Sequence, residues 1–154
     1  MSDHMRMRRQ LHGPRPPLAA PAGIGLLPLW KARPVELHAL LRDGYAGGGG
    51  IVGEFDAWFW PLVEDSEFDP GLVLIAADRK GCPLGLAQSW TGGFLKDLVV
   101  APGSRRRGIG AFLLEATFDA FRTRGRSHVD LKVETANHAA RRLYARHCMV
   151  EIEG

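Results

Sequence analysis

The sequence predicts a mixed α/β domain with a central sheet and flanking helices. The chain has 154 residues, the size of one ordinary domain, and 45% of them are hydrophobic, as in a typical globular protein. Short apolar runs of strand length occur between longer amphipathic patterns with helical spacing. Strands and helices that are interspersed in this way pack in layers around a mixed sheet.

The first 22 residues are rich in arginine and proline and have no apolar period. We therefore expect a disordered tail over residues 1–22, followed by a single domain over residues 23–154. The prolines interrupt any apolar run that could act as a secretion signal, and no stretch is long enough to cross a bilayer. With two cysteines that give neither a disulfide framework nor metal-ligand spacing, we expect a cytoplasmic protein without a metal.

The first half of the domain is predicted to contain one strand and two helices. Residues 25–30 are compatible with a strand that their proline confines to an edge. A short helical pattern begins at Pro34, which suits the first turn of a helix, and the four glycines of residues 47–50 then form a flexible loop. A second helix is predicted from residue 54 to about residue 60, where Pro61 either ends it or interrupts it.

Three strands are predicted next. Residues 72–77 are a continuous apolar run that ends at a turn signal, Asp-Arg-Lys-Gly. Residues 84–90 form its expected hairpin partner. Residues 94–100 form a further strand, which a Pro-Gly pair stops.

Residues 109–124 give the strongest helical signal of the chain. Six residues line one apolar face: Ile109, Phe112, Leu113, Ala116, Ala120 and Phe121. Gly125 stands at the expected C-terminal stop of this helix. A strand over residues 129–133, a last helix that opens at Asn137 and the start of a strand over residues 149–152 complete the prediction.

Charge is distributed unevenly along the domain. Ten acidic residues accompany four basic ones over residues 34–98, whereas ten basic residues accompany four acidic ones over residues 104–146. A polyanionic ligand would be attracted to the second half and a cation to the first. A nucleic-acid binder that uses the basic residues is one alternative, but no stacking aromatics are interleaved with them.

The segment Arg105-Arg-Arg-Gly-Ile-Gly110 joins a predicted strand to the long helix. Backbone amides at a helix N-terminus form an anion site when glycines remove steric bulk, and arginines suit a pyrophosphate. The segment is not a P-loop, because no Gly-Lys-Ser/Thr follows. It is not the dinucleotide fingerprint either, because Leu113 stands where the third glycine belongs. The alternative is a basic loop that only caps the helix.

A second motif follows about thirty residues later, and the two together resemble the GNAT N-acetyltransferase superfamily. That family has Arg/Gln-x-x-Gly-x-Gly/Ala at a strand-to-helix junction, matched here by Arg105, Gly108 and Gly110. It then has an asparagine, an alanine and a tyrosine on one helix, matched here by Asn137, Ala140 and Tyr144. The resemblance covers roughly residues 72–149.

The resemblance implies that acetyl-CoA is the cofactor. It implies a mostly antiparallel, twisted sheet with about four helices, splayed to form a slot for the pantetheine arm. The arm would pair with the strand backbone, and Asn137 would hydrogen-bond it. Tyr144 would protonate the departing thiolate, because a phenol with a pKa near 10 keeps its proton at neutral pH. The cofactor-binding residues so implied are Leu98, Val99, Val100, Arg105, Arg106, Arg107, Gly108, Ile109, Gly110, Ala111, Asn137 and Tyr144.

The implied reaction is direct attack of a neutral primary amine on the thioester, polarised by the backbone amide of Val99. Relatives often carry a glutamate at the place of Lys96, so the usual base is missing. Asp97, which could be structural, and Glu134, whose direction is open, are the remaining carboxylates.

The amine acceptor would meet the first two helices and the loop between them. Glu54, Asp56 and Trp58 are the candidate substrate-binding residues, because acids beside aromatics receive a cationic amine. The alternative is that the aromatics belong to the core and the acids are solvated. A small amine, a polyamine and a protein lysine or N-terminus all satisfy the sequence, and neither nucleic acid nor membrane is expected as a partner.

The chain ends soon after its last predicted strand begins, whereas relatives usually continue into a seventh strand. We therefore expect the seventh strand to be missing. A homodimer is expected, since dimerisation would cover an exposed edge strand. A catalytically inactive CoA-binding sensor or partner protein of the same fold is the alternative function, favoured by Lys96 and the missing strand.

Overall fold

The structure, a computed structural model, describes residues 3–14 and 17–154. Its centre is one seven-stranded sheet with the strand order β2-β3-β4-β5-β6-β1-β7. The strands are β1 (His4–Gln10), β2 (Gly25–Leu27), β3 (Val73–Ala77), β4 (Pro83–Trp90), β5 (Phe94–Val100), β6 (His128–Glu134) and β7 (Val150–Ile152). All neighbouring strands are antiparallel except β5 and β6, which are parallel. The predicted mixed α/β class with a mostly antiparallel sheet is confirmed.

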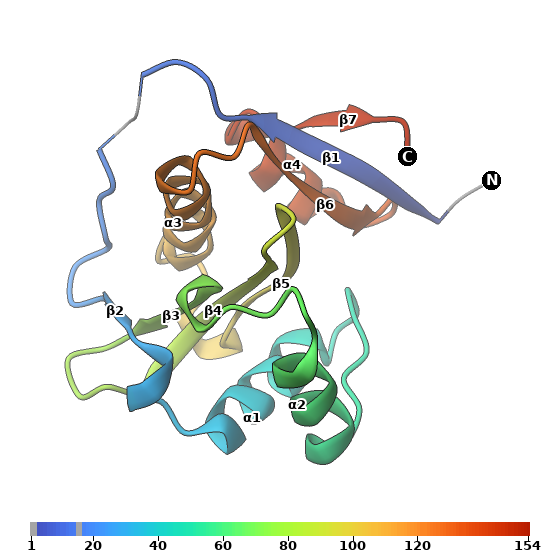
Figure 1. Ribbon diagram of the computed structural model, residues 1–154. Coiled ribbons are helices and arrows are strands. Elements are labelled where there is room, and N and C mark those ends of the chain that lie inside the picture. Colours follow the sequence, from blue (N-terminus) through green and yellow to red (C-terminus); the bar gives the residue numbers. More distant parts are fainter. Residues whose placement is uncertain (1–2, 15–16) are drawn as a thin grey trace.

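Four α-helices cover the sheet (Figure 1). They are α1 (Pro34–Tyr45), α2 (Phe55–Glu64), α3 (Ile109–Thr123) and α4 (His138–Arg146), and 3-10 helices cover Leu29–Lys31, Pro70–Leu72 and Pro102–Ser104. Helices α1 and α3 pack on opposite faces of β4, since side chains of consecutive strand residues point to opposite faces. Leu86 belongs to the core cluster with α1, and the next residue, Ala87, belongs to the cluster with α3.

Most predicted elements from residue 72 onward match the structure within two residues. The first predicted strand is shorter than expected: β2 ends before Pro28, and a 3-10 helix follows. The second helix was predicted to end at about residue 60 or to continue past Pro61. Helix α2 continues to Glu64, and Pro61 lies inside it. No helix among the described residues is long and apolar enough to span a bilayer.

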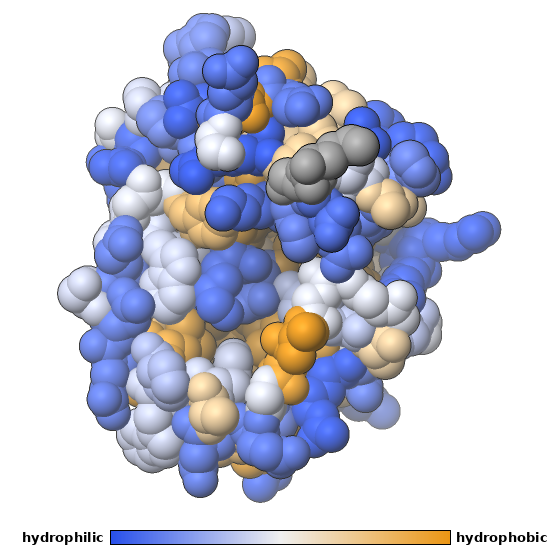
Figure 2. Space-filling model, turned by 90° about the vertical axis from the view of Figure 1, so that its right-hand side faces the viewer, coloured by the Kyte–Doolittle hydropathy of each residue, from blue (hydrophilic) through white to orange (hydrophobic). Residues whose placement is uncertain are grey.

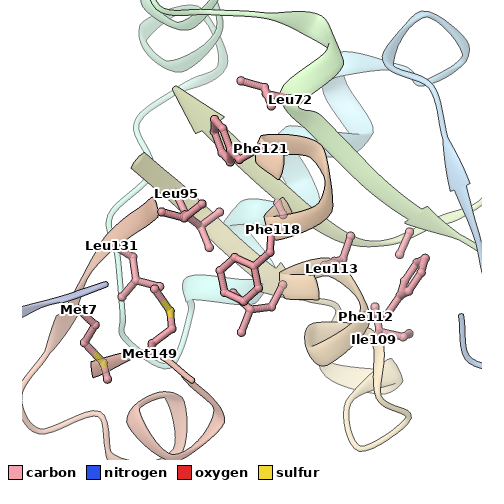
Figure 3. Close-up of a cluster of buried hydrophobic side chains, with 14 of the residues drawn as sticks. Met7, Leu72, Leu95, Ile109, Phe112, Leu113, Phe118, Phe121, Leu131 and Met149 are labelled. Atoms are coloured by element: carbon pink, nitrogen blue, oxygen red, sulfur yellow. The ribbon is translucent and has the colours of Figure 1, made fainter. Parts of the chain in front are cut away.

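The expected disorder of the N-terminal segment is wrong for residues 4–10, which form β1. This strand lies between β6 and β7 and pairs antiparallel with both. Its alternate residues point into the α3 core, where Met7 is 5% exposed and lies near Leu131 and Met149 (Figure 3). The expected tail also included residues 1–2 and 15–16, which lie outside the described residues.

The arginines of β1 are bound to acids of the body. The buried carboxylate of Asp130 accepts hydrogen bonds from Arg6 at 3.0 Å and from Arg8 at 2.7 and 2.9 Å. Burial opposes the ionisation of Asp130, but the two guanidinium groups hold its pKa below the ordinary value. Arg9 bonds Glu115 at 2.9 Å. The basic composition of this segment predicted disorder, because composition gives no information on the distant acidic residues with which the arginines form ion pairs.

The expected absence of a seventh strand is also wrong. The sheet has seven strands, because β1 from the N-terminal segment supplies the additional strand. Strand β7 pairs with β1 over three residues and has no other strand partner in the described part of the chain. The expected homodimer was partly based on the missing strand. Because the sheet has its seventh strand, that argument for a homodimer no longer holds.

We predict that Gly44→Ala lowers the free energy of unfolding by about 1–2 kcal/mol, although alanine is the better helix former. A Cβ atom at residue 44 would lie 2.7 Å from the Cβ of Val99, an atom that cannot move without the backbone of β5. Urea titration of the variant measures the loss. Gly47→Ala is the control, because a Cβ atom there meets nothing within 4 Å. Equal stability of Gly44→Ala and the parent would show that α1 can move away from β5.

Candidate active site

A slot lies between β5 and β6. The two strands are paired at one position only, Phe94 with Asp130, and then diverge. The hollow between them has a volume of about 270 Å³. It is lined by residues of α1 and its following loop, β5, β6, the α3 start and α4, among them Tyr45, Gly49, Leu98, Val99, Val100, Arg105, Gly110, Glu134, Asn137 and Tyr144. Because the strands diverge, the backbone of β5 beyond residue 94 is unpaired on its β6 side.

One end of the slot meets the N-terminus of α3. Gly108 precedes this helix with φ at 79°, and Arg106 also has a positive φ of 65°. In the described structure, none of the backbone amides from Arg106 to Ala111 has a hydrogen-bond acceptor. Unsatisfied amides at a helix start carry partial positive charge and favour an anion. Arg105 lines the slot and donates to the Gly44 carbonyl at 3.2 Å.

Not every residue of this loop contributes a side chain to the slot. Arg106, Arg107 and Ala111 do not line it, and the first two are exposed. The Ile109 side chain is 1% exposed and belongs to the α3 core cluster, so only its backbone is available to a ligand. Glycine at 108 is required by the left-handed backbone, which L side chains rarely adopt.

Asn137 has two functions available at once. Its Oδ1 accepts from the Ala140 amide at 3.1 Å and so caps α4. The Nδ2 group has no acceptor in the described structure, and the Asn137 side chain lines the slot near Gly49. The cap fixes the amide orientation, because the oxygen is committed to the helix. Nδ2 is therefore left as a donor for a ligand in the slot.

Two tyrosines line the slot, one from α4 and one from α1. Burial raises the pKa of the Tyr144 phenol to about 12. Burial and the charge of Asp97 raise the pKa of Tyr45 far above its ordinary value. Both phenols therefore hold their protons at neutral pH. Tyr144 is the residue that the sequence predicted here, whereas Tyr45 was missed. A signal for Tyr45 existed, because it lies four residues after Leu41 on the same helical face.

A β-bulge shapes the strand beside the slot. Gln88 of β4 pairs with Asp97 of β5, but the next residue, Ser89, pairs with Leu95. Lys96 is thus the extra residue of the bulge, a feature that re-aims side chains beside functional sites. The Asp97 carboxylate accepts from the Tyr45 hydroxyl at 2.8 Å and from Lys96 Nζ at 2.9 Å.

A second hollow opens on the other side of these residues, toward α2. Its volume is about 300 Å³, and its walls include Ile51, Trp58, Asp65, Trp90, Lys96 and Asp97. Lys96 lines both this hollow and the slot, so the two spaces meet at the bulge. Figure 2 shows apolar patches recessed among mostly hydrophilic residues on the side of the molecule that lies at the right of Figure 1.

The predicted catalytic and acceptor residues are only partly brought together. Tyr144 and Glu134 lie in the slot, and Asp97 lies in the neighbouring hollow. Trp58 lines that hollow too. Glu54 and Asp56 are exposed and line none of the hollows described above, and Asp56 accepts instead from the indole of a neighbouring tryptophan.

Comparison with known proteins gives consistent matches. A family model described as the acetyltransferase (GNAT) family matches residues 35–148. The chain is 37% identical over 87 residues to a mycothiol acetyltransferase of Clavibacter michiganensis subsp. michiganensis. That match covers 54% of this chain and 28% of the relative, so the chain spans little more than a quarter of the curated protein.

Solved structures match over a greater length. A GCN5-related N-acetyltransferase from Sphaerobacter thermophilus superposes with a TM-score of 0.80 at 25% identity, over 97% of this chain and 48% of that one. Diaminobutyrate acetyltransferase EctA from Paenibacillus lautus, solved with its substrate and coenzyme A, has a TM-score of 0.59 at 21% identity. That match covers 74% of this chain and 68% of the enzyme, and at this identity it concerns the fold alone.

Proposed function

The chain belongs to the acetyltransferase (GNAT) family, and on that premise we propose that it transfers an acetyl group from acetyl-CoA to a primary amine by direct attack. The observation that carries the proposal is the slot between β5 and β6, which leads to the unpaired amides at the start of α3. A slot with an anion site at one end suits a long cofactor with a pyrophosphate.

The described residues fit the cofactor. The backbone amides of Arg106 to Ala111 would hold its pyrophosphate, with Arg105 beside them. The free β5 edge over residues 98–100 would pair with the pantetheine arm as an added strand does. Asn137 Nδ2 would donate to the same arm.

When bound, acetyl-CoA supplies a thioester carbonyl, which a slot-facing amide of β5, that of Leu98 or Val100, would polarise. The backbone of Val99, which the resemblance suggested for this role, faces β4 instead, as does that of Ala101, whose amide donates to Leu84.

We assign the two proton transfers to Asp97 and Tyr144. Asp97 lines the hollow beside the slot and bonds Tyr45 of the slot, and it would accept the proton that the attacking amine loses as the N–C bond forms. As the C–S bond breaks, Tyr144 would give its proton to the leaving thiolate. Tyr45 and Lys96 hold the Asp97 carboxylate in place through hydrogen bonds of 2.8 and 2.9 Å. Glu134 is the second carboxylate candidate.

Calorimetric titration with acetyl-CoA tests the cofactor site. We predict that the parent binds it and that Gly108→Asp weakens binding at least 100-fold, because a carboxylate would stand at the pyrophosphate. Gly125→Asp is a matched control. It introduces the same charge and a similar backbone strain, since φ is 74° at Gly125 and 79° at Gly108, at the opposite end of α3.

The possible results separate the alternatives. Absence of binding to a folded parent would exclude the proposed cofactor site, and salt-dependent binding of nucleic acid would then be tested. Binding without turnover of any amine would favour a CoA-binding sensor. Equal loss of binding in both glycine variants would point to a damaged α3.

The homodimer stays a prediction with one remaining argument. Strand β7 forms an edge of the sheet, and its Val150 side chain is 60% exposed. Sedimentation of the purified chain over a range of concentrations measures the association directly.

A further inference from the structure

The hollow beside the slot combines an apolar wall with a few charged residues. The uncharged residues that line it are Leu41, Ile51, Val52, Gly53, Ala57, Trp58, Pro61, Leu62 and Trp90. The charged residues that line it are Asp65, Lys96 and Asp97. Its volume of about 300 Å³ lies in the range of small-molecule sites. A ligand that fills this hollow is therefore expected to have an apolar body and a charged end.

Lys96 and Asp97 place opposite charges side by side at this hollow. Lys96 Nζ lies 2.9 Å from Asp97 Oδ2 and 6.0 Å from the centre of the Trp90 ring, and all three residues line the hollow. The side chain of Lys96 is 37% exposed and that of Asp97 is 13% exposed, so both are accessible to a ligand. We call this pair the charged corner of the hollow.

The charged corner has hydrogen-bonding capacity that the protein does not use. A lysine ammonium has three N–H donors, and Asp97 is the one acceptor found for Lys96 among the described residues. The two Asp97 oxygens accept from Tyr45 and from Lys96, and each oxygen can accept a second bond. The corner can therefore receive an anion at Lys96 and a cation at Asp97 at the same time.

Asp65, the third charged residue of the hollow, is separate from this corner. Its Oδ1 accepts from the backbone amide of Glu67 at 2.8 Å, in the turn that follows α2. No ion pair joins Asp65 to Lys96 in the part of the chain that the structure describes. A ligand with two cationic groups would use Asp65 and Asp97, and 1,4-diaminobutane is the amine that tests this alternative.

We propose that the acceptor is a free α-amino acid with an apolar side chain. Its amine and its carboxylate are attached to one carbon atom, so its two charges are adjacent, as are those of Asp97 and Lys96. The amine meets Asp97, the carboxylate accepts from Lys96 Nζ, and the side chain lies against the apolar wall. Acetyl transfer to the amine gives an N-acetyl amino acid and free CoA, and the substrate carboxylate is unchanged. The inference rests on the acetyl transfer proposed above.

The test compares L-phenylalanine with L-phenylalaninamide as acceptors at saturating acetyl-CoA. The amide keeps the amine and the ring but has no negative charge. We expect Lys96→Met to lower kcat/KM about 10-fold for L-phenylalanine and less than about 3-fold for the amide, the effect of one charge-assisted hydrogen bond. The substitution also removes a partner of the proposed base Asp97. That change affects both acceptors, so it cancels when their losses are compared.

Two further variants separate the charge of Lys96 from its structural role. Lys96→Arg keeps the cation and is expected to keep most of the activity with L-phenylalanine. Lys31→Met is the matched control, because the Lys31 ammonium also lies near a tryptophan ring, at 5.1 Å, but the residue lines neither the slot nor the hollow. It should not change the ratio of the two kcat/KM values. Equal losses for both acceptors in Lys96→Met overturn the proposal, since the lysine would then act only through Asp97.

Binding to the CoA-saturated protein separates this inference from the proposed function, because NMR titration measures affinity without turnover. Binding of L-phenylalanine that depends on Lys96, without acetylation, supports the amino-acid site and contradicts the transferase proposal. Acetylation of amines without a preference that depends on Lys96 contradicts the amino-acid site and leaves the transferase proposal intact. Tighter binding of 1,4-diaminobutane than of L-phenylalanine overturns the amino-acid site in favour of a dication. Equal binding of glycine and L-phenylalanine overturns the requirement for an apolar side chain.

Discussion

Tyr144→Phe is expected to lower kcat about 100-fold and to leave the affinity for acetyl-CoA within 2-fold of the parent. The phenol is buried in the slot, and its pKa of about 12 keeps it protonated at neutral pH, so that it can donate its proton to the sulfur as negative charge develops there. Loss of a positioned general acid typically lowers a rate by 10²- to 10⁴-fold. The ring packs against the α3 core cluster, and phenylalanine keeps that contact. Steady-state kinetics with saturating acetyl-CoA measure the change.

Tyr45→Phe provides a comparison, since it removes the other phenol of the slot. We expect a smaller loss of kcat, because Tyr45 orients the proposed base through its 2.8 Å hydrogen bond and does not itself transfer a proton. Equal kcat for Tyr144→Phe and the parent would assign protonation of the thiolate to water. Equal losses in both variants would indicate that the two tyrosines act together.

Removal of residues 1–10 is expected to abolish stable folding. The deletion takes away the whole of β1, including the buried Met7 side chain and both guanidinium partners of Asp130. Removing the partner of a buried charge costs about 3–5 kcal/mol, and truncating a buried methionine costs about 2–5 kcal/mol. Their combined effect approaches the total stability of an ordinary domain. Circular dichroism and thermal unfolding of the shortened chain measure the outcome.

Two substitutions check the cause of that effect. Met7→Leu preserves apolar volume and should cost less than about 1.5 kcal/mol. Met7→Asp places a charge in the α3 core and should be severely destabilising. A shortened chain that unfolds at the same temperature as the parent would show that β1 is dispensable, as expected of a disordered tail.

The sequence predicted the second half of the fold well because its signals are local. The long helix has one continuous apolar face, and each strand is bounded by turn residues. Residues 94–100 were predicted with the bounds that the structure has. The N-terminal strand was missed because its stability comes from partners more than 120 residues away, as in the hydrogen bonds of Arg6 and Arg8 with Asp130. Methionine and arginine alternate over residues 5–8, which is typical of a strand with one buried face. The prediction of disorder relied instead on the basic, proline-rich composition of the whole segment.

In the candidate site, too, residues with a local sequence signal were predicted and residues that only tertiary packing brings together were missed. Residues within the two motifs were found because their spacing is characteristic: Gly108, Asn137 and Tyr144 all lie where the sequence placed them, at the start of α3 or on the slot. Tyr45 and Gln88 belong to no motif, and only the packing of α1 and β4 against β5 brings them to Asp97. Acidic composition drew attention to Glu54 and Asp56, which are solvated.

The position of β1 in the sheet has a consequence for biosynthesis. Its partners in β6 and β7 lie far along the chain, so β1 must wait unpaired until a long stretch that follows it has been synthesised. Until then β1 is a basic segment without the counter-charge of Asp130. Pairings between distant segments also slow the search for the native state. We therefore expect this protein to gain more from chaperones during synthesis than a sheet assembled in chain order.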